Sequence, residues 1–160
     1  MKTNKLKSLL VVFSFHHKNT EKIANVFAQV LDTQIKTPRQ INPEELQEYR
    51  LIGFGSGIYD EKHHKTLLNL ADKLPQVTNR KAFIFSTSGM TREAAKAHSP
   101  LRHKLQSKGY MIVDEFSCAG FNTISYLRFI GGMNKGRPNA EDLKHAEEFA
   151  QNLITLVHKK

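Results

Sequence analysis

Three segments rich in Ser, Thr, Gly and Asn each follow an apolar run, and residues of these types could bind an anion. The segments are SFHHKNT (14–20), GSGIYD (55–60) and STSGM (86–90). Small residues let backbone N–H groups come close to a ligand, and hydroxyl groups add donors for anionic oxygens. If the three runs are strands of one sheet, the segments share one edge and form a single ligand site.

The first segment leads directly into an expected helix at Asn19–Leu31. The first N–H groups of a helix have no partner within it, so they attract anions. The simpler alternative is that Asn19 or Thr20 only caps the helix, while Ser14 only ends the strand. Three such segments at one edge favour the ligand site. Side chains that could complete a phosphate site here are Ser14, His16, Lys18, Asn19 and Thr20.

Alternating apolar runs and helical patterns predict how these segments are positioned. Continuous apolar runs, typical of buried parallel strands, occur at Leu9–Phe15, Leu51–Phe54, Ala82–Phe85 and Tyr110–Val113, with a weaker extended piece at Thr33–Thr37. Helical spacing covers Asn19–Leu31, Lys62–Lys73, Thr91–Ser107 with an interruption at Pro100, and a last helix capped by Asn139. This alternation predicts a single α/β domain over 1–160. We expect this domain to have three layers around a doubly wound, five-stranded parallel sheet of strand order 2-1-3-4-5. Its ligand should lie beyond the carboxyl ends of the strands.

Several other chemistries lack the residues that they need. The nucleotide-binding patterns GxxxxGK[ST] and GxGxxG are absent, and no arginine follows Cys118 at the spacing of a cysteine phosphatase. Adjacent histidines, as in the pairs at 16–17 and 63–64, rarely point at one metal ion, so we expect no metal site. Cys118 could serve a redox role near the sheet edge, but a small buried core residue is the favoured interpretation.

The charge and the cysteine content limit the classes of binding partner and the cellular compartment that we expect. The chain has 24 Lys and Arg against 15 Asp and Glu, a net charge of +9, which favours acidic partners. No block of five basic residues occurs, so nucleic acid is not expected. The basic, apolar N-terminus lacks a cleavage site and is far shorter than a membrane span. With a single cysteine, these features predict a cytoplasmic protein. The oligomeric state stays open.

Four stretches together resemble the flavodoxin family, over nearly the whole chain. They are SFHHKNTEKIA, GFGSGIY, FIFSTSG and CAGFNT…GGMNKGRPNAEDL. The resemblance implies non-covalently bound FMN. Its phosphate would lie at 14–20, its isoalloxazine ring beside 56–60 and its pyrimidine end against the backbone of 86–90. The implied FMN-binding residues are Ser14, His16, Lys18, Asn19, Thr20, Ser56, Gly57, Ile58, Tyr59, Ser86, Thr87, Ser88 and Gly89.

Tyr59 is the expected stacking partner of the flavin ring, although it could instead pack on the following helix. The chain has no Trp, so a second aromatic partner would be His63, His64 or Phe121. Two features depart from the family. HHK replaces the usual glycine of the first loop, and the net charge is basic where electron-carrying flavodoxins are acidic. The expected function is electron transfer through FMN between redox partner proteins, here with an acidic docking face. The alternatives are an FMN-dependent NAD(P)H:quinone-type reductase and a binding module without cofactor.

Overall fold

The computed structural model describes residues 6–14, 18–89, 91–120 and 136–158. Its centre is a sheet in which five parallel strands lie in the order β2-β1-β3-β5-β6. The predicted doubly wound α/β fold and its strand order are therefore confirmed. A sixth strand, β4 (Lys62–His63), pairs antiparallel with the end of β3 and was not predicted. The five parallel strands are β1 (Ser8–Phe13), β2 (Gln34–Lys36), β3 (Leu51–Tyr59), β5 (Arg80–Ser88) and β6 (Tyr110–Ala119).

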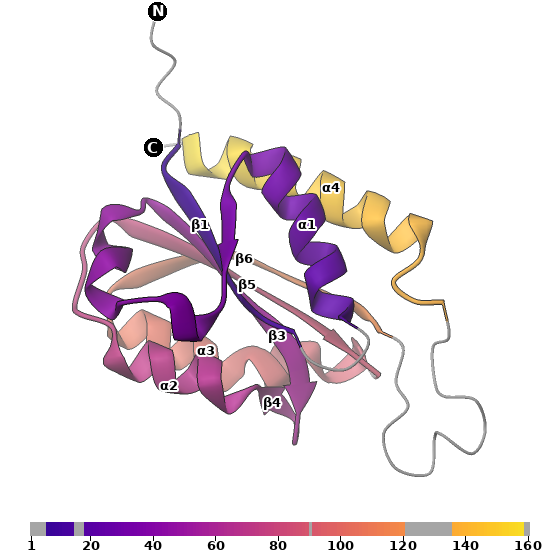
Figure 1. Cartoon of the computed structure of the whole chain (residues 1–160), viewed down its shortest axis with the longest axis horizontal. Helices are drawn as coiled ribbons and strands as arrows, with labels where there is room; N and C mark the ends of the chain where they lie inside the picture. Colours follow the sequence, from indigo (N-terminus) through magenta and orange to yellow (C-terminus); the bar gives the residue numbers. More distant parts are fainter. Residues whose placement is uncertain (1–5, 15–17, 90, 121–135, 159–160) are drawn as a thin grey trace, which may run out of the picture.

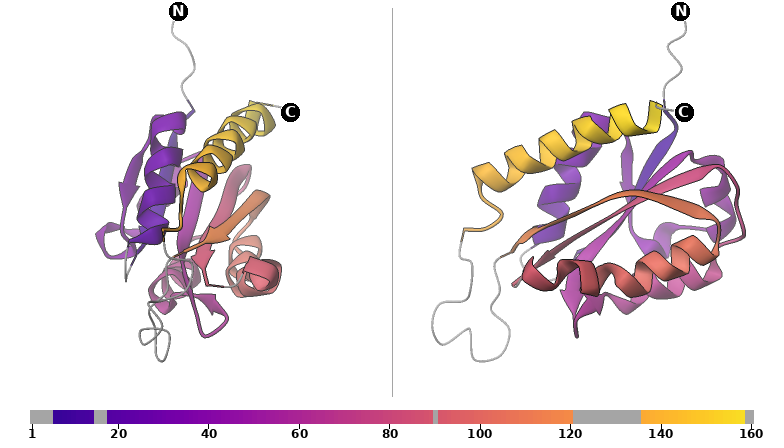
Figure 2. Two further views of the ribbon diagram at one scale, coloured as in Figure 1. Left: turned by 90° about the vertical axis from the view of Figure 1, so that its right-hand side faces the viewer. Right: turned by 180° about the vertical axis from the view of Figure 1, so that it is seen from behind.

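Two helices cover each face of the sheet, which gives three layers (Figure 1). α1 (Asn19–Leu31) and α4 (Ala140–His158) lie side by side on one face, and α2 (Lys65–Lys73) and α3 (Ala94–Ser107) cover the other. The view from behind shows the same separation of the two helix pairs (Figure 2). Each helix buries one apolar stripe, as the sequence pattern predicted. Short 3-10 turns lie at Pro38–Gln40, Pro43–Glu48 and Thr91–Glu93.

Aromatic side chains fill the layer between the sheet and the α1–α4 pair. Phe27 of α1 is fully buried, and its ring centroid lies between 5.0 and 5.7 Å from those of four other phenylalanines. The rings of Phe83 and Phe85 occupy the space that side chains at Gly53 and Gly55 would need. The large rings of β5 are therefore accommodated because β3 has no side chains at these two positions. The four partners of Phe27 are Phe83, Phe85, Phe116 and Phe149.

Three strands extend farther toward their carboxyl ends than the apolar runs predicted. β3 continues through the expected loop 56–60 as far as Tyr59, β5 continues to Ser88, and β6 continues to Ala119. The small residues remain extended because the ladder holds them on both sides: Ser56 pairs with Ser86, and Ser86 with Ser117. Apolarity ends before hydrogen bonding does, so strand ends predicted from apolarity fall short.

Two helix predictions were also wrong in detail. The helix predicted at Lys62–Lys73 begins only at Lys65, because the first two residues form β4. Pro100 does not interrupt α3, which runs unbroken through it. The buried stripe that includes Leu101 and Leu105 holds the helix against the sheet despite the missing backbone N–H group. The predicted cap of α4 is confirmed, since Asn139 Oδ1 accepts the Asp142 N–H at 3.0 Å.

Candidate functional site

The amino end of α1 meets the carboxyl end of the sheet at the first predicted ligand segment. Ser14 Oγ accepts the Glu21 N–H at 3.3 Å, so this hydroxyl caps the helix and keeps its own proton for a further partner. Lys18 is exposed, and its backbone has the left-handed conformation, with φ 53° and ψ 36°. This is the conformation that glycine adopts most readily, so the lysine takes a backbone shape that a loop glycine would supply. His16 lies outside the described residues.

A buried pair of hydroxyls joins α1 to β5. Thr20 Oγ1 and Thr87 Oγ1 lie 2.8 Å apart, and the two residues are only 2% and 4% exposed. A bond between two hydroxyls uses one of their two protons, so the other remains available to an anion. The first and third predicted segments are thus in direct contact.

The end of β6 adds a fourth segment, in which the sequence analysis named no FMN-binding residue. Gly120 N–H donates to Ser88 O at 3.0 Å. A Cβ atom at Gly120 would lie 2.6 Å from Asn19 Nδ2, so only glycine lets the Asn19 amide approach the backbone here. Its place in the motif CAGFNT was the available signal.

The second predicted segment forms a hairpin rather than a loop. Ile58 pairs with His63 and Tyr59 with Lys62, and the two residues between have positive φ. Such a two-residue turn suits the twist of a hairpin. The Tyr59 ring lies over Gly57, where a Cβ atom would be 3.2 Å from it, and burial raises the pKa of its phenol. Gly57 therefore makes room for the aromatic side chain.

His64 is held beside Tyr59 by packing on several sides. Its ring stacks on Phe13 at 3.9 Å and meets Tyr59 edge-on at 5.1 Å. Its Nδ1 accepts the Thr66 N–H at 3.2 Å, which caps α2. Ser56 is fully buried: its Oγ donates to Gly57 O at 2.7 Å and accepts the His64 N–H at 3.1 Å. The Ser56 hydroxyl therefore links the backbone of β3 to the residue that follows β4.

Ser86 takes part in a buried network that sequence reasoning missed. Its Oγ lies 2.7 Å from His98 Nε2, and His98 Nδ1 lies 2.9 Å from Glu115 Oε1. Arg102 donates to both oxygens of Glu115, at 2.8 and 2.7 Å. Burial lowers the pKa of His98, although the bond to Glu115 opposes this. Burial alone would raise the pKa of Glu115, but hydrogen bonds from Arg102 and His98 lower it overall.

His63 is buried beneath the hairpin and cannot stack on a flavin ring. Its Nε2 donates to Phe85 O at 3.1 Å, and its ring lies 4.9 Å from that of His98. Burial and, to a smaller extent, the neighbouring His98 lower the pKa of His63 to about 3. Among the described residues no three His, Cys, Asp or Glu side chains lie close enough together to hold a metal ion. Phe121, another suggested partner, lies outside the described residues.

Cys118 is a core residue, as the favoured interpretation held. It is 6% exposed, and burial, with the nearby Asp142, raises the pKa of its thiol to about 12. A thiol held in its neutral form is a poor nucleophile. A polar hollow of about 350 Å³ adjoins it, lined in part by Thr91, Arg137 and His145.

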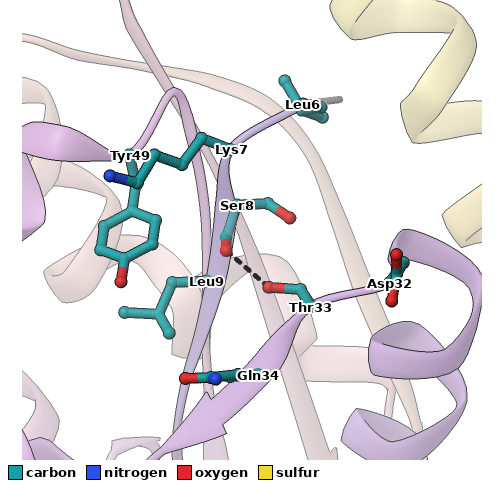
Figure 3. Close-up of a pocket in the computed structure, with 8 residues that line it drawn as sticks. All are labelled: Leu6, Lys7, Ser8, Leu9, Asp32, Thr33, Gln34 and Tyr49. Carbon is teal, nitrogen blue, oxygen red and sulfur yellow. Dashed lines mark hydrogen bonds between the residues drawn. The ribbon is translucent and has the colours of Figure 1, made fainter. Parts of the chain in front are cut away.

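A larger hollow, of about 450 Å³, lies at the opposite, amino-terminal edge of the sheet. Figure 3 shows its lining, where Thr33 Oγ1 donates to Ser8 O at 2.6 Å. Lys7 lies near Tyr49, with its Nζ 5.3 Å from the ring centroid. None of the predicted ligand segments reaches this edge.

Comparison with known families matches residues 10–129 to the flavodoxin domain. The chain belongs to the flavodoxin family. This flavodoxin-family chain is 46% identical over 149 residues to an uncharacterized protein of Methanocaldococcus jannaschii, a match that covers 93% of this chain and 99% of that protein.

Two solved flavodoxins share the fold. Oxidised flavodoxin 1 from Bacillus cereus has a TM-score of 0.68 at 17% identity and covers 96% of this chain and 99% of its own. A Fusobacterium nucleatum flavodoxin bound to flavin mononucleotide has a TM-score of 0.67 at 11% identity, with coverages of 94% and 98%. Within its described residues, this flavodoxin-family chain has no helix that is long and apolar enough to cross a membrane.

Proposed function

We propose that this protein binds FMN non-covalently and carries electrons through it. The observation that carries the proposal is the meeting of three segments at the carboxyl edge of the sheet, in a chain of the flavodoxin family. The start of α1 contacts β5 through Thr20 and Thr87, and the Tyr59 hairpin ends the neighbouring strand. Phosphate-type donors and an aromatic ring thus occur along one edge.

The residues at the start of α1 fit the phosphate group. A phosphate requires hydrogen-bond donors and a positive potential, and the amino end of a 13-residue helix supplies both. The spare proton of the Thr20–Thr87 pair and the exposed Lys18 add to them. We assign the phosphate to this helix end, with contacts from Ser14, His16, Lys18, Asn19 and Thr20.

The hairpin and the end of β5 fit the flavin ring. Tyr59 is half-buried and presents an aromatic surface above Gly57, which suits stacking on a flat ring. We assign the ring to a place beside Ser56, Gly57, Ile58 and Tyr59, with its pyrimidine end against the backbone of 86–89. FMN supplies the redox chemistry when bound, and the chain supplies binding, orientation and electrostatics.

The charge of the chain suggests its partners. With a net charge of +9, the protein favours redox partners that present an acidic docking face. We place this exchange in the cytoplasm, in keeping with a single, buried cysteine.

Absorption spectroscopy of the purified protein, before and after addition of FMN and removal of the excess, tests the proposal. We expect retained flavin bands with quenched fluorescence. Tyr59→Leu should weaken FMN binding about 2- to 10-fold, since an aromatic stacking pair contributes about 0.5–1.5 kcal/mol beyond burial. Tyr49→Leu, at the opposite edge of the sheet, is the matched control. A protein that retains no FMN would contradict the proposal and favour a binding module without cofactor.

A second assay separates the carrier from an enzyme. The FMN-loaded protein is mixed with NADH or NADPH and a soluble quinone. An electron carrier should turn over only when a separate reductase is added. Steady oxidation of the nicotinamide by the protein alone would instead assign it as a reductase.

A further inference from the structure

A chain of hydrogen bonds passes from the predicted FMN segment to the far side of the β5–β6 pair. Thr87 faces α1, while its neighbour Ser86 faces α3 and bonds to His98. His98 in turn bonds to Glu115 on β6. A carboxylate can only accept, so Nδ1 of His98 carries the proton and Nε2 accepts the Ser86 O–H. The neutral imidazole thus has one nitrogen, Nε2, that can still take up a proton.

This nitrogen is buried, but the network around it adjoins a hollow. His98 is only 2% exposed. A hollow of about 230 Å³ is lined by Ala94, Ala95, His98, Arg102, Glu115 and Ser117. Its volume suffices for several water molecules, and the polar side chains of His98, Arg102 and Glu115 line it together with alanines. A proton can therefore reach the network from the α3–β6 side, away from the edge where FMN is assigned.

The charges around His98 are balanced, so a proton there adds a full charge to the interior. Glu115 of β6 is neutralised by Arg102 of α3, and both Arg102 Nη2 and His98 Nδ1 bond to the same oxygen, Oε1. His63 of β4 packs against the ring of His98 and is itself neutral. Ser86 of β5 is uncharged. A negative charge added near the end of β5 therefore favours the protonated form of the His98 imidazole, because the charges of Glu115 and Arg102 offset each other.

We propose that His98 takes up a proton when FMN at the end of β5 is reduced. The inference rests on the proposed function, because it needs FMN beside Ser86–Gly89. Electrons from a reduced partner protein add negative charge at that site, and one proton from solvent binds His98 Nε2. One N–H bond forms and no other covalent bond changes. The Ser86 hydroxyl then accepts from Nε2 instead of donating to it.

The state of His98 can be followed directly by NMR spectroscopy of its ring nitrogens as a function of pH. The wild-type protein is measured without FMN, with oxidised FMN, and with FMN reduced by dithionite. We expect the pKa of His98 to be higher with reduced than with oxidised FMN. In weakly buffered solution, His98→Gln should take up fewer protons on reduction than the wild type. His103→Gln is the matched control, because His103 is exposed on the same helix.

Two further variants test the network without any cofactor. Removing the carboxylate by Glu115→Gln should lower the pKa of His98 in the FMN-free protein, and Arg102→Gln should raise it. The absence of these opposite shifts would contradict the hydrogen-bond network on which the inference rests. Failure to retain FMN would overturn both proposals. Retention of FMN with the same pKa of His98 in the oxidised and reduced protein would overturn this inference alone.

Discussion

The hydroxyl pair of Thr20 and Thr87 offers a sharp test of how the site is built. Thr20→Val keeps the shape of the side chain but removes one hydroxyl, and so leaves the Thr87 hydroxyl buried without its partner. A buried polar group without a partner costs about 1–3 kcal/mol, whereas a neutral hydrogen bond contributes only about 0.5–1.5 kcal/mol net. Each single variant should therefore lower the free energy of unfolding by about 2 kcal/mol.

The double variant should cost less than the sum of the two single variants. With both hydroxyls replaced by methyl groups, no unsatisfied group remains, and the loss should be about 1 kcal/mol. Urea unfolding of the FMN-free protein, followed by circular dichroism, measures all four free energies. Additive effects would refute the direct bond, because residues that interact show a coupling of about 0.5–3 kcal/mol.

The same variants test the assigned phosphate contact. A hydroxyl that donates to a charged oxygen contributes about 1.5–3 kcal/mol, so Thr20→Val should weaken FMN binding by about 10- to 100-fold. Fluorescence quenching of FMN gives the affinity. Thr33→Val is the control, because its hydroxyl bonds to Ser8 O at the opposite edge of the sheet. Equal losses of affinity in both variants would show that the effect is one of stability.

Two predictions concern stability and pH. Burial holds the pKa of His63 at about 3, below its unfolded value near 6.5, so the unfolded chain binds this proton first. The neutral His63 costs no stability above about pH 6.5, and the free energy of unfolding then falls by up to about 1.4 kcal/mol per pH unit as the pH is lowered toward 3. His63→Gln should flatten this slope, which urea unfolding at pH 7, 5 and 4 measures. The Arg137 guanidinium lowers the pKa of Asp142, so its contribution is present above about pH 4 and is lost as the pH falls through the lowered value. Asp142→Asn should cost about 1–2 kcal/mol at pH 7, because the carboxylate also accepts the Asn139 N–H at 2.8 Å, and a thermal melt with no loss at pH 7 would contradict this.

The parallel sheet was predictable because a sheet covered on both faces requires apolar runs joined by helices, and the number of such runs suits the order 2-1-3-4-5. Leu9–Val12 and Ala82–Phe85 are such runs, and both are buried. The hairpin at Tyr59 was not predictable in this way. Asp60 tolerates a positive φ, but Glu61 is not a typical residue there, so the turn lacks the usual Asn-Gly or Asp-Gly signal.

The three ligand segments could be proposed from the sequence because the residues of each are contiguous. The network of His98 could not, since Glu115 lies 17 residues away on another element. The sequence does hint at the network, because His98 lies on the buried stripe of α3 with Leu101 and Leu105, and a buried polar residue needs a hydrogen-bond partner. The identity of that partner depends on the register between α3 and β6, which no local pattern specifies.

The glycines of β3 also have a consequence for the evolution of this fold. The Phe83 and Phe85 rings occupy the space of the missing side chains at Gly53 and Gly55. Neither pair can change one member alone without a clash or a cavity. Homologous sequences should therefore vary in step, with a smaller residue at 83 or 85 wherever 53 or 55 carries a side chain. An alignment that shows this covariation would mark chains that share this packing, even where the predicted ligand segments have diverged.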